Sequence, residues 1–206
     1  MKKQWNAEEK LQYERALLAQ GVKYIAGVDE VGRGPLAGPV VCSAVIMPLD
    51  EADLIVGVDD SKKLSEKKRE ELAEKIKEKA LCYTIIEIDE KTIDEINILE
   101  ATKLGMKKAI ETLAITPDVV LTDGNMTIDI AHRQHSVIHG DALSYSIGSA
   151  SIIAKVYRDK LMDEFAKQYP QYAFEKNKGY GTAVHIQGIK EHGLCPIHRR
   201  TFTKKF

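Results

Sequence analysis

Two adjacent carboxylates, Asp29 and Glu30, precede a glycine-flanked arginine within the stretch 27–41, which reads GVDEVGRGPLAGPVV. The apolar residues before them predict a buried strand that carries both acids at its far end. Because side chains alternate between the two faces of a regular strand, these acids can share one ligand only where the strand ends or twists sharply. Taken alone, such a pair is more often a solvated turn than a site.

The glycines and prolines after the two acids predict a wide loop between two strands. Gly32 and Gly34 permit backbone conformations that other residues avoid, and the prolines that follow disfavour a helix. A β-branched run at 40–46 predicts the second strand of a hairpin. The loop also fits a loose dinucleotide-binding pattern, G-x-G-x-x-A, but that fingerprint needs a helix directly after it. We therefore exclude a nucleotide site at this position.

Two more acids follow apolar segments. Asp123 ends the run VVLT and precedes a glycine, and Asp141 follows a short apolar segment at 136–138 and a glycine. In alternating α/β chains, functional groups gather at the carboxyl ends of strands. We therefore expect Asp29, Glu30 and these two acids to converge.

Clustered carboxylates repel one another and raise one another's pKa values unless a cation neutralises them. Ligand sets made only of oxygen favour Mg²⁺ or Mn²⁺ over zinc. Paired ions of this kind activate water and stabilise the leaving oxygen at a phosphodiester. The sequence thus predicts a two-metal site for Mn²⁺ or Mg²⁺.

The length, apolar content and charge of the chain limit its possible domain organisation and partners. A chain of 206 residues with 44% apolar content can form one domain, or one domain with a small appendage. The net charge of -1 gives no overall sign of a polyanionic partner. From Lys176 onward, however, seven lysines and arginines face a single acid, Glu191. This basic end is compatible with phosphate contacts and equally with an ordinary solvated surface.

The cysteines and the N-terminus favour a cytoplasmic protein. The three cysteines, Cys42, Cys82 and Cys195, are scattered and form no C-x-x-C pair, which argues against a disulfide framework and a zinc site. The N-terminus leads into charged residues rather than an apolar signal segment, and no run approaches eighteen apolar residues. We expect a soluble chain without membrane contact.

Hydrophobic periodicity and capping residues predict alternating helices and strands, without repeats or linkers. The expected helices are 6–21, 65–80, one that carries 99–113, 144–169 and a short one from Thr182 to Gly193, and the expected strand between the second and third is 81–88.

Seven motifs together resemble one known family, bacterial type 2 ribonuclease H (ribonuclease HII). They are 27–41, Asp60–Leu64, Thr122–Asn125, Gly140–Ala142, Ala150–Asp159, Lys178–Thr182 and Pro196–Phe202, and they occur in the family's order from Tyr24 to Phe202. Each motif alone is weak, whereas the set is specific.

The resemblance implies an α/β ribonuclease H-like fold, with a mixed central β-sheet flanked by helices and a small helical C-terminal part. It implies one catalytic domain over 1–206, of which roughly 170–206 is a substrate-binding portion. The implied activity is hydrolysis of the RNA strand of RNA–DNA hybrids. The implied enzyme also incises 5′ of single ribonucleotides embedded in duplex DNA, leaves 3′-hydroxyl and 5′-phosphate ends, and serves ribonucleotide removal in DNA replication and repair.

The resemblance also implies residue roles. Metal ligands and catalytic groups would be Asp29, Glu30, Asp123 and Asp141. The segment Gly32, Arg33 and Gly34 would sense the ribose 2′-hydroxyl, and Tyr180 would stack on the sugar of the next deoxynucleotide. Phosphate contacts are expected from Ser61, Lys62, Lys63, Lys155, Arg158 and Arg199, for which ordinary surface or helix contacts are an equally open reading.

Two alternatives are kept. The first is a catalytically idle hybrid-binding module of the same fold, against which the complete set of four acids argues, because negative charge beside phosphates does not help a pure binder. The second is a type 3 ribonuclease H, which usually has glutamate as its fourth acid and an additional N-terminal domain. Asp141 favours type 2. We expect a monomer, and the sequence leaves any protein partner unknown.

Overall fold

A mixed five-stranded sheet forms the centre of the protein in the computed structural model, which describes residues 5–206. The strand order is β3-β2-β1-β4-β5, with bounds β1 Ile25–Val31, β2 Val40–Ile46, β3 Cys82–Ile88, β4 Val119–Asp123 and β5 Arg133–Val137. The β1–β2 and β2–β3 pairs are antiparallel, whereas β4 runs parallel to β1 and to β5. The mixed sheet and the first hairpin are therefore confirmed.

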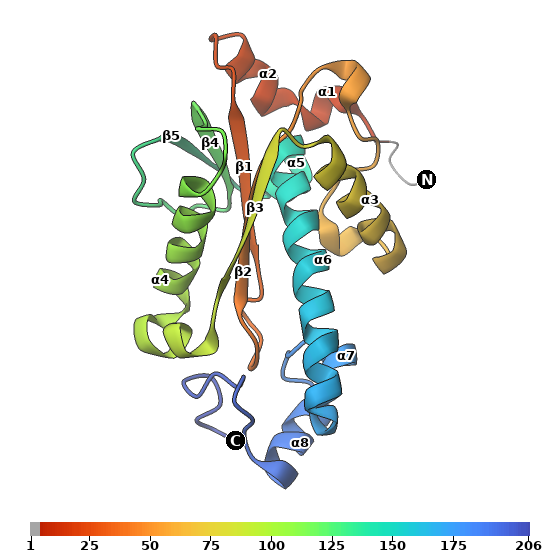
Figure 1. The fold of residues 1–206 in the computed structure, drawn as a ribbon, viewed down its shortest axis with the longest axis vertical. Coiled ribbons are helices and arrows are strands. Elements are labelled where there is room, and N and C mark those ends of the chain that lie inside the picture. The colour runs from red at the N-terminus through yellow and green to blue at the C-terminus, as the bar shows by residue number, and fades with distance from the viewer. Residues whose placement is uncertain (1–4) are drawn as a thin grey trace.

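Helices cover both faces of the sheet, as Figure 1 shows, with α4 on one side and α6 with α3 on the other. The helix bounds are α1 Ala7–Lys10, α2 Gln12–Leu18, α3 Glu66–Lys79, α4 Glu90–Glu111, α5 Gly140–Leu143, α6 Tyr145–Gln168, α7 Phe174–Asn177 and α8 Ala183–His192. Short 3-10 turns lie at Glu51–Asp53, Ser61–Lys63 and Pro170–Tyr172. Among residues 5–206, no helix is long and apolar enough to cross a membrane.

The pleat of β2 shows how the sheet separates two cores. Ala44 and Ile46 pack with Met106 and Ile110 of α4, whereas Val45 faces the cluster formed with α6 and α3. Because both faces are covered, every residue of β2 is buried. Such a two-sided strand reads as a continuous apolar run rather than an alternating one.

Gly27 in β1 allows α6 to approach the sheet closely. A Cβ atom at this position would lie 2.1 Å from the carbonyl carbon of Ser146, so any larger residue would push the helix away. The small residues at the start of α6 complement this contact. The close approach fixes α6 against the strand that carries Asp29.

Three expected elements differ in detail. The helix predicted over 6–21 is two helices, because Leu11 is buried between α1 and α2 with non-helical dihedral angles. The helix that carries 99–113 begins earlier, and it is broken at Asn97, whose side chain caps the second part through the N–H groups of Leu99 and Glu100. The strand expected at 136–138 is instead β5, so Asp141 lies in the first turn of α5 and not at a strand end.

The C-terminal segment packs against the glycine-rich loop 32–39, which lies far away in sequence. Ala37 forms an isolated antiparallel bridge with His198, and Gly38 donates its N–H to the carbonyl of Ile197 at 2.8 Å. A small apolar cluster that includes Tyr172, Phe174 and Ile189 supports this region. Residues of the last quarter of the chain therefore hold the loop 32–39 in place.

Candidate active site

Asp29, Asp123 and Asp141 converge at one edge of the sheet, each offering a carboxylate oxygen within 4.8 Å of the others. Asp29 comes from β1, Asp123 ends the neighbouring parallel strand β4, and Asp141 follows β5 in α5. Asp29 and Asp141 are buried, and Asp123 is half-buried. Segments more than a hundred residues apart therefore contribute to one acidic centre.

Glu30 lies outside this group of three oxygens. Because β1 continues to Val31, the sharp strand end that would have turned both acids toward one point is not present, so the structure brings three of the four acids together and the metal role of Glu30 stays a prediction. Glu30 is half-buried, and its Oε1 lies 3.6 Å from Nη1 of Arg33. It belongs to the same charged neighbourhood, because Glu30 and Asp123 still repel each other.

The electrostatics of the acids follow from burial and mutual repulsion. Burial raises the pKa of Asp29 well above its usual range, and the charges of Glu30 and Asp123 raise it further. Burial also raises the pKa of Glu30 to about 7, although Arg33 acts in the opposite direction. The pKa of Asp141 is raised by burial and by Asp123. Because these carboxylates resist full ionisation on their own, a bound cation would stabilise their charged forms.

The segment Asp60–Leu64 contributes the nearest cation. Nζ of Lys62 lies 3.8 Å from Oδ2 of Asp141, and attraction to Asp141 and Asp29 outweighs the effect of burial and raises the pKa of this lysine. Its side chain is otherwise exposed. Ser61, in contrast, is buried, and its hydroxyl lies 3.0 Å from that of Ser151. The side chain of Lys62 is therefore accessible to a phosphate group beside Asp141. The hydroxyl of Ser61 is buried and is not accessible in this way.

The predicted ribose-sensing segment lies beside the predicted stacking residue. The ring of Tyr180 comes within 3.5 Å of the position that a Cβ on Gly34 would occupy. The two segments are also joined by a hydrogen bond from the N–H of Leu36 to the carbonyl of Gly179 at 2.8 Å. Tyr180 is 46% exposed, although it is a large aromatic residue. The structure therefore brings these residues together and leaves the tyrosine ring accessible.

Arg158 and Arg199 require a correction. Both were expected to contact phosphates, yet both are 0% exposed, and their guanidinium groups donate to main-chain carbonyls of loop 32–39. A buried guanidinium in this arrangement offers no donor to a duplex outside. Lys155 is also occupied, because its Nζ pairs with Asp159 at 2.7 Å. Lys63 pairs with Asp60 at 3.7 Å and is exposed.

One residue near the site was missed in the sequence. Nζ of Lys10 donates to Oδ1 of Asp59 at 2.6 Å and to the carbonyl of Ala142 at 2.5 Å, although Lys10 comes from the N-terminal helix α1. This contact ties the Asp60–Leu64 region to α5, which carries Asp141. Lys10 is nearly buried, and no local pattern distinguishes it from the exposed lysines of the chain.

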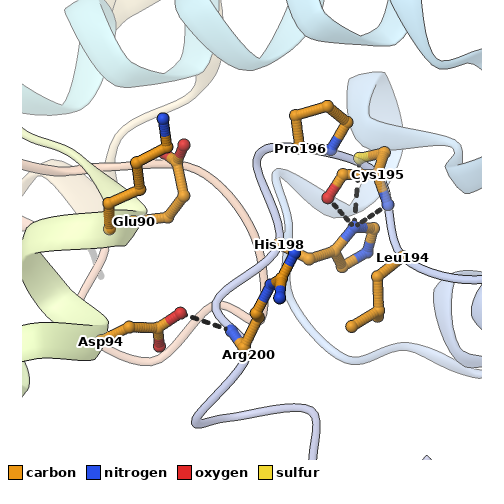
Figure 2. A pocket seen from close by; sticks show the side chains of 8 residues that line it. Glu90, Asp94, Leu194, Cys195, Pro196, His198 and Arg200 are labelled. Atoms are coloured by element: carbon orange, nitrogen blue, oxygen red, sulfur yellow. Dashed lines mark hydrogen bonds between the residues drawn. The ribbon is translucent and has the colours of Figure 1, made fainter.

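A prominent cleft does not coincide with the acids. It has a volume of about 690 Å³, lies between α4 and the C-terminal segment, and is lined by residues such as Glu90, Asp94, Cys195 and Arg200 (Figure 2). None of the four candidate acids lines it. We place the candidate site at the acids, because they form a group that could hold a metal ion.

The donor set fits hard divalent cations. The carboxylates of Asp29, Asp123 and Asp141 supply only oxygen, and among residues 5–206 no other group of three or more His, Cys, Asp or Glu side chains could hold a metal ion. Oxygen-only sets of this kind are typical of Mg²⁺ and Mn²⁺. The arrangement can therefore place divalent cations beside a glycine-lined loop and an exposed tyrosine.

Comparison with known sequences and structures gives a consistent result. A family profile described as Ribonuclease HII matches residues 26–205. Proteins named Ribonuclease HII from Ruminiclostridium cellulolyticum and Ligilactobacillus salivarius are 54% and 55% identical to this chain, over 97% and 95% of it and 77% and 75% of their own length.

Solved structures agree. The ribonuclease H2 from Pyrococcus horikoshii has a TM-score of 0.74 and 27% identity over 88% of this chain and 94% of its own. The same TM-score, with 26% identity over 86% of this chain and 94% of that one, is found for a chain of the PCNA:RNase HII complex from Archaeoglobus fulgidus. The predicted α/β ribonuclease H-like fold is thereby confirmed.

Proposed function

Because the chain belongs to the ribonuclease HII family, and is thus an endoribonuclease, we propose that it incises duplex DNA on the 5′ side of single embedded ribonucleotides. Activity on the RNA strand of RNA–DNA hybrids follows from the family itself. The finer proposal rests on one observation, namely that the loop which packs against the Tyr180 ring at Gly34 also lies beside the acids, because Nη1 of Arg33 is 3.6 Å from Oε1 of Glu30. Relatives above 50% identity are named ribonuclease HII, so the type 3 alternative is set aside.

We assign the metal ligands to Asp29, Asp123 and Asp141, with Glu30 as a fourth acid that approaches when cations are bound. The family depends on divalent metals, and two Mn²⁺ or Mg²⁺ ions would supply activation of water and stabilisation of charge on the leaving oxygen. The donor chemistry of the three carboxylates supports this assignment. Lys62, beside Asp141, would neutralise charge on the scissile phosphate.

Recognition of the ribose rests on the 2′-hydroxyl, which alone distinguishes RNA from DNA at a given sugar. We assign it to the main chain of Gly32, Arg33 and Gly34, whose glycines let a backbone come close to a ligand. Tyr180 would pack on the deoxyribose of the following nucleotide, where a 2′-hydroxyl would be in the way. This pair of contacts favours a ribonucleotide followed by DNA.

Hydrolysis of the phosphodiester forms one phosphorus–oxygen bond and breaks another. Water adds to phosphorus, the bond from phosphorus to the preceding O3′ breaks, and a proton ends on that oxygen. The products are a 3′-hydroxyl on the upstream deoxynucleotide and a 5′-phosphate on the ribonucleotide. Such ends suit ribonucleotide removal from DNA in replication and repair. A cytoplasmic location and a monomeric state stay predictions.

One experiment tests the proposal. A labelled DNA duplex with a single ribonucleotide is incubated with the protein, with and without Mn²⁺, beside an all-DNA duplex of the same sequence. We expect one incision 5′ of the ribonucleotide, only with metal, and an upstream product that a DNA polymerase extends. Binding of the duplex without cleavage at any metal concentration would instead support the idle binding module.

A further inference from the structure

Two fully buried arginines lie under the glycine-rich loop, and neither forms an ion pair with any residue of the described chain 5–206. Burial lowers the pKa of Arg158 to about 10 and that of Arg199 to about 9, so both stay charged at neutral pH. Burying a charge without an acidic partner is costly unless hydrogen bonds compensate. Here the compensation comes from main-chain carbonyls.

Arg199 is bonded to the loop alone. Its Nη1 donates to the carbonyl of Arg33 at 2.9 Å, its Nη2 to that of Gly32 at 2.5 Å, and its Nε and Nη2 to that of Gly38 at 2.9 and 2.7 Å. Three carbonyls of one loop therefore point inward to a single guanidinium. Only arginine offers this rigid planar set of donors, whereas lysine offers one compact ammonium.

The inward carbonyls determine where the amide groups point. In a trans peptide the C=O of one residue and the N–H of the next are directed oppositely, and no peptide bond of the described chain is cis. The inward carbonyls of Gly32 and Arg33 therefore direct the N–H groups of Arg33 and Gly34 away from the core. Within residues 5–206 neither N–H has a protein acceptor, whereas those of Leu36 and Gly38 do.

Arg158 joins the loop to the segment that carries Tyr180. Its Nε donates to the carbonyl of Pro39 at 3.0 Å and its Nη2 to that of Ala37 at 3.2 Å, while its Nη1 reaches the carbonyl of Lys178 at 2.9 Å. The side chain also fills the space beneath Gly32, where a Cβ would lie 2.2 Å from Nε. One guanidinium thus sets the distance between the two predicted sugar-reading segments.

From these contacts we propose that Arg158 and Arg199 are positioning residues for sugar recognition, with separate tasks. Arg199 holds the N–H groups of Arg33 and Gly34 toward the ribose 2′-hydroxyl, and Arg158 holds Tyr180 in register with that loop. The inference rests on the proposed function, because it concerns how the same site reads its substrate. It replaces the direct phosphate contact expected for both arginines.

The separate tasks predict separate kinetic signatures. Two substrates are compared: a DNA duplex with one ribonucleotide, and an RNA–DNA hybrid in which every sugar of the cut strand has a 2′-hydroxyl. Arg158→Lys should lower the ratio of kcat/KM for the first over the second by about tenfold, because only the first substrate uses the tyrosine contact. Arg199→Lys should lower both values about equally, because both substrates need the 2′-hydroxyl contact.

A double-mutant cycle with Tyr180→Ala makes the distinction sharp. In the Tyr180→Ala background, Arg158→Lys should no longer change the substrate ratio, whereas Arg199→Lys should keep its full effect on both substrates. Additive effects of Arg158→Lys and Tyr180→Ala on the ratio would overturn the proposed coupling. Loss of affinity for an all-DNA duplex in Ca²⁺, with a weaker salt dependence, would show that the arginines contact phosphates instead.

Met162→Leu is the matched control. Met162 packs beneath the same loop, where a Cβ on Gly38 would lie 2.6 Å from its Sδ, but it has no hydrogen bond to a loop carbonyl. The change conserves volume and should cost little stability. It should leave the substrate ratio as in the wild type. A changed ratio in this variant would mean that any disturbance below the loop has the same effect, which contradicts a specific role of the arginines.

Hydrogen exchange of the wild-type protein tests the geometry even if an arginine variant fails to fold. The amides of Arg33 and Gly34 should exchange rapidly in the free protein, and those of Leu36 and Gly38 slowly. In Ca²⁺, a duplex with a ribonucleotide should protect the first pair, and an all-DNA duplex should not. Protection of the first pair in the free protein, or none in the complex, would overturn the inference. Absence of incision by the wild type would instead refute the proposed function.

Discussion

Oδ1 of Asp123 accepts a hydrogen bond from the main-chain N–H of Gly140 at 2.6 Å, and the N–H of Asp141 lies 3.4 Å from the same oxygen. The carboxylate at the end of β4 therefore holds the start of α5, the helix that carries the third acid. The negative charge of Asp123 and its Oδ1 acceptor have different roles. Removing the charge affects cation binding, whereas removing the oxygen also releases Asp141.

Asp123→Asn should abolish cleavage while preserving the fold. The amide oxygen can still accept from Gly140, but the neutral side chain no longer attracts a divalent cation. The loss should be at least about a thousandfold in kcat, because metal-assisted charge stabilisation is worth several kcal/mol. Without metal, the unfolding temperature should equal or exceed that of the wild type, because repulsion with Asp29 and Glu30 is relieved. Turnover on the single-ribonucleotide duplex and thermal unfolding measure both effects.

Asp123→Ala is the informative companion, because it removes the acceptor of the Gly140 N–H as well as the charge. It should be less stable than Asp123→Asn by about 1 kcal/mol, the usual value of such a hydrogen bond. Undiminished turnover in Asp123→Asn would contradict the assignment of this residue to the metals.

Divalent metal should stabilise the wild-type fold measurably. The three carboxylates repel one another in the free protein, so a cation that binds the native state and not the unfolded chain raises the free energy of unfolding. At a free Mn²⁺ concentration a hundred times Kd the gain is about 2.7 kcal/mol. Denaturant unfolding with and without Mn²⁺ measures it. Asp123→Asn should lose most of this gain, whereas Asp129→Asn, at an exposed acid paired with Lys107, should keep it. An equal gain in both variants would place the metal elsewhere.

The elements whose signals are local in the sequence were predictable. The helices predicted over 65–80 and 144–169 are α3 and α6, capped by Ser65 and Ser144, because capping residues and helical periodicity act over a few neighbouring positions. The β1–β2 hairpin was predictable for the same reason, since β-branched runs enclose a loop of glycines and prolines. Local chemistry thus accounts for most of the scaffold.

The arrangement around loop 32–39 was not predictable in this way. A phosphate contact of Arg199 was implied by the family resemblance, with ordinary surface or helix contacts equally open, but its partners are carbonyls 161 to 167 positions away. Contacts of that range depend on the assembled fold. Glu30 was grouped with the other acids from its position in the sequence, whereas the pleat of β1 separates it from them. Asp141 was expected at a strand end because Gly140 gave no sign that a helix begins there.

Gly34→Ala should impair substrate recognition with little change in stability, whereas Gly32→Ala should lower stability. At Gly34 the new methyl group would make an ordinary contact of 3.5 Å with the ring of Tyr180, so the free energy of unfolding should change by less than about 0.5 kcal/mol. The methyl group would occupy space beside the outward N–H groups, so kcat/KM on the single-ribonucleotide duplex should fall at least about tenfold. Steady-state kinetics and denaturant unfolding provide the two measurements.

Gly32→Ala should behave differently, because its φ is +94° and its Cβ would meet Arg158. It should lower the free energy of unfolding by more than about 1 kcal/mol. Gly21→Ala serves as the control, since Gly21 has a φ of +83° with open space around it, and it should cost stability without loss of activity. If Gly34→Ala keeps the wild-type kcat/KM on the single-ribonucleotide duplex, the face of the loop at Gly34 does not contact the substrate.

A pair of buried histidines, His185 and His198, supports the Tyr180 segment. The N–H of Cys195 donates to Nδ1 of His198, so the proton of His198 is on Nε2, which lies 3.0 Å from Nε2 of His185. His185 therefore accepts at Nε2 and donates from Nδ1 to the carbonyl of Tyr180 at 2.9 Å. Both rings are neutral in this chain of hydrogen bonds, and a second proton would place two N–H groups face to face.

The direction of the pH dependence follows. Burial and His185 lower the pKa of His198 from the usual 6.5 to about 4, and burial also lowers that of His185. Between these pH values the unfolded chain binds more protons than the folded one, so stability is complete above about pH 6.5 and falls as the pH falls toward 4. From pH 7 to pH 5, His198 alone should cost on the order of 2 kcal/mol.

Denaturant unfolding across this range tests the assignment by comparison with a variant that cannot titrate. His198→Gln should lose stability less steeply than the wild type between pH 7 and pH 5, because glutamine binds no proton in either state. His192→Gln, at a half-exposed histidine of α8, should keep the wild-type slope. If the slopes of the wild type and His198→Gln coincide, His198 binds protons equally in the folded and the unfolded protein, and burial does not lower its pKa. The hydrogen-bond chain from Cys195 to Tyr180 would then have to run in another order.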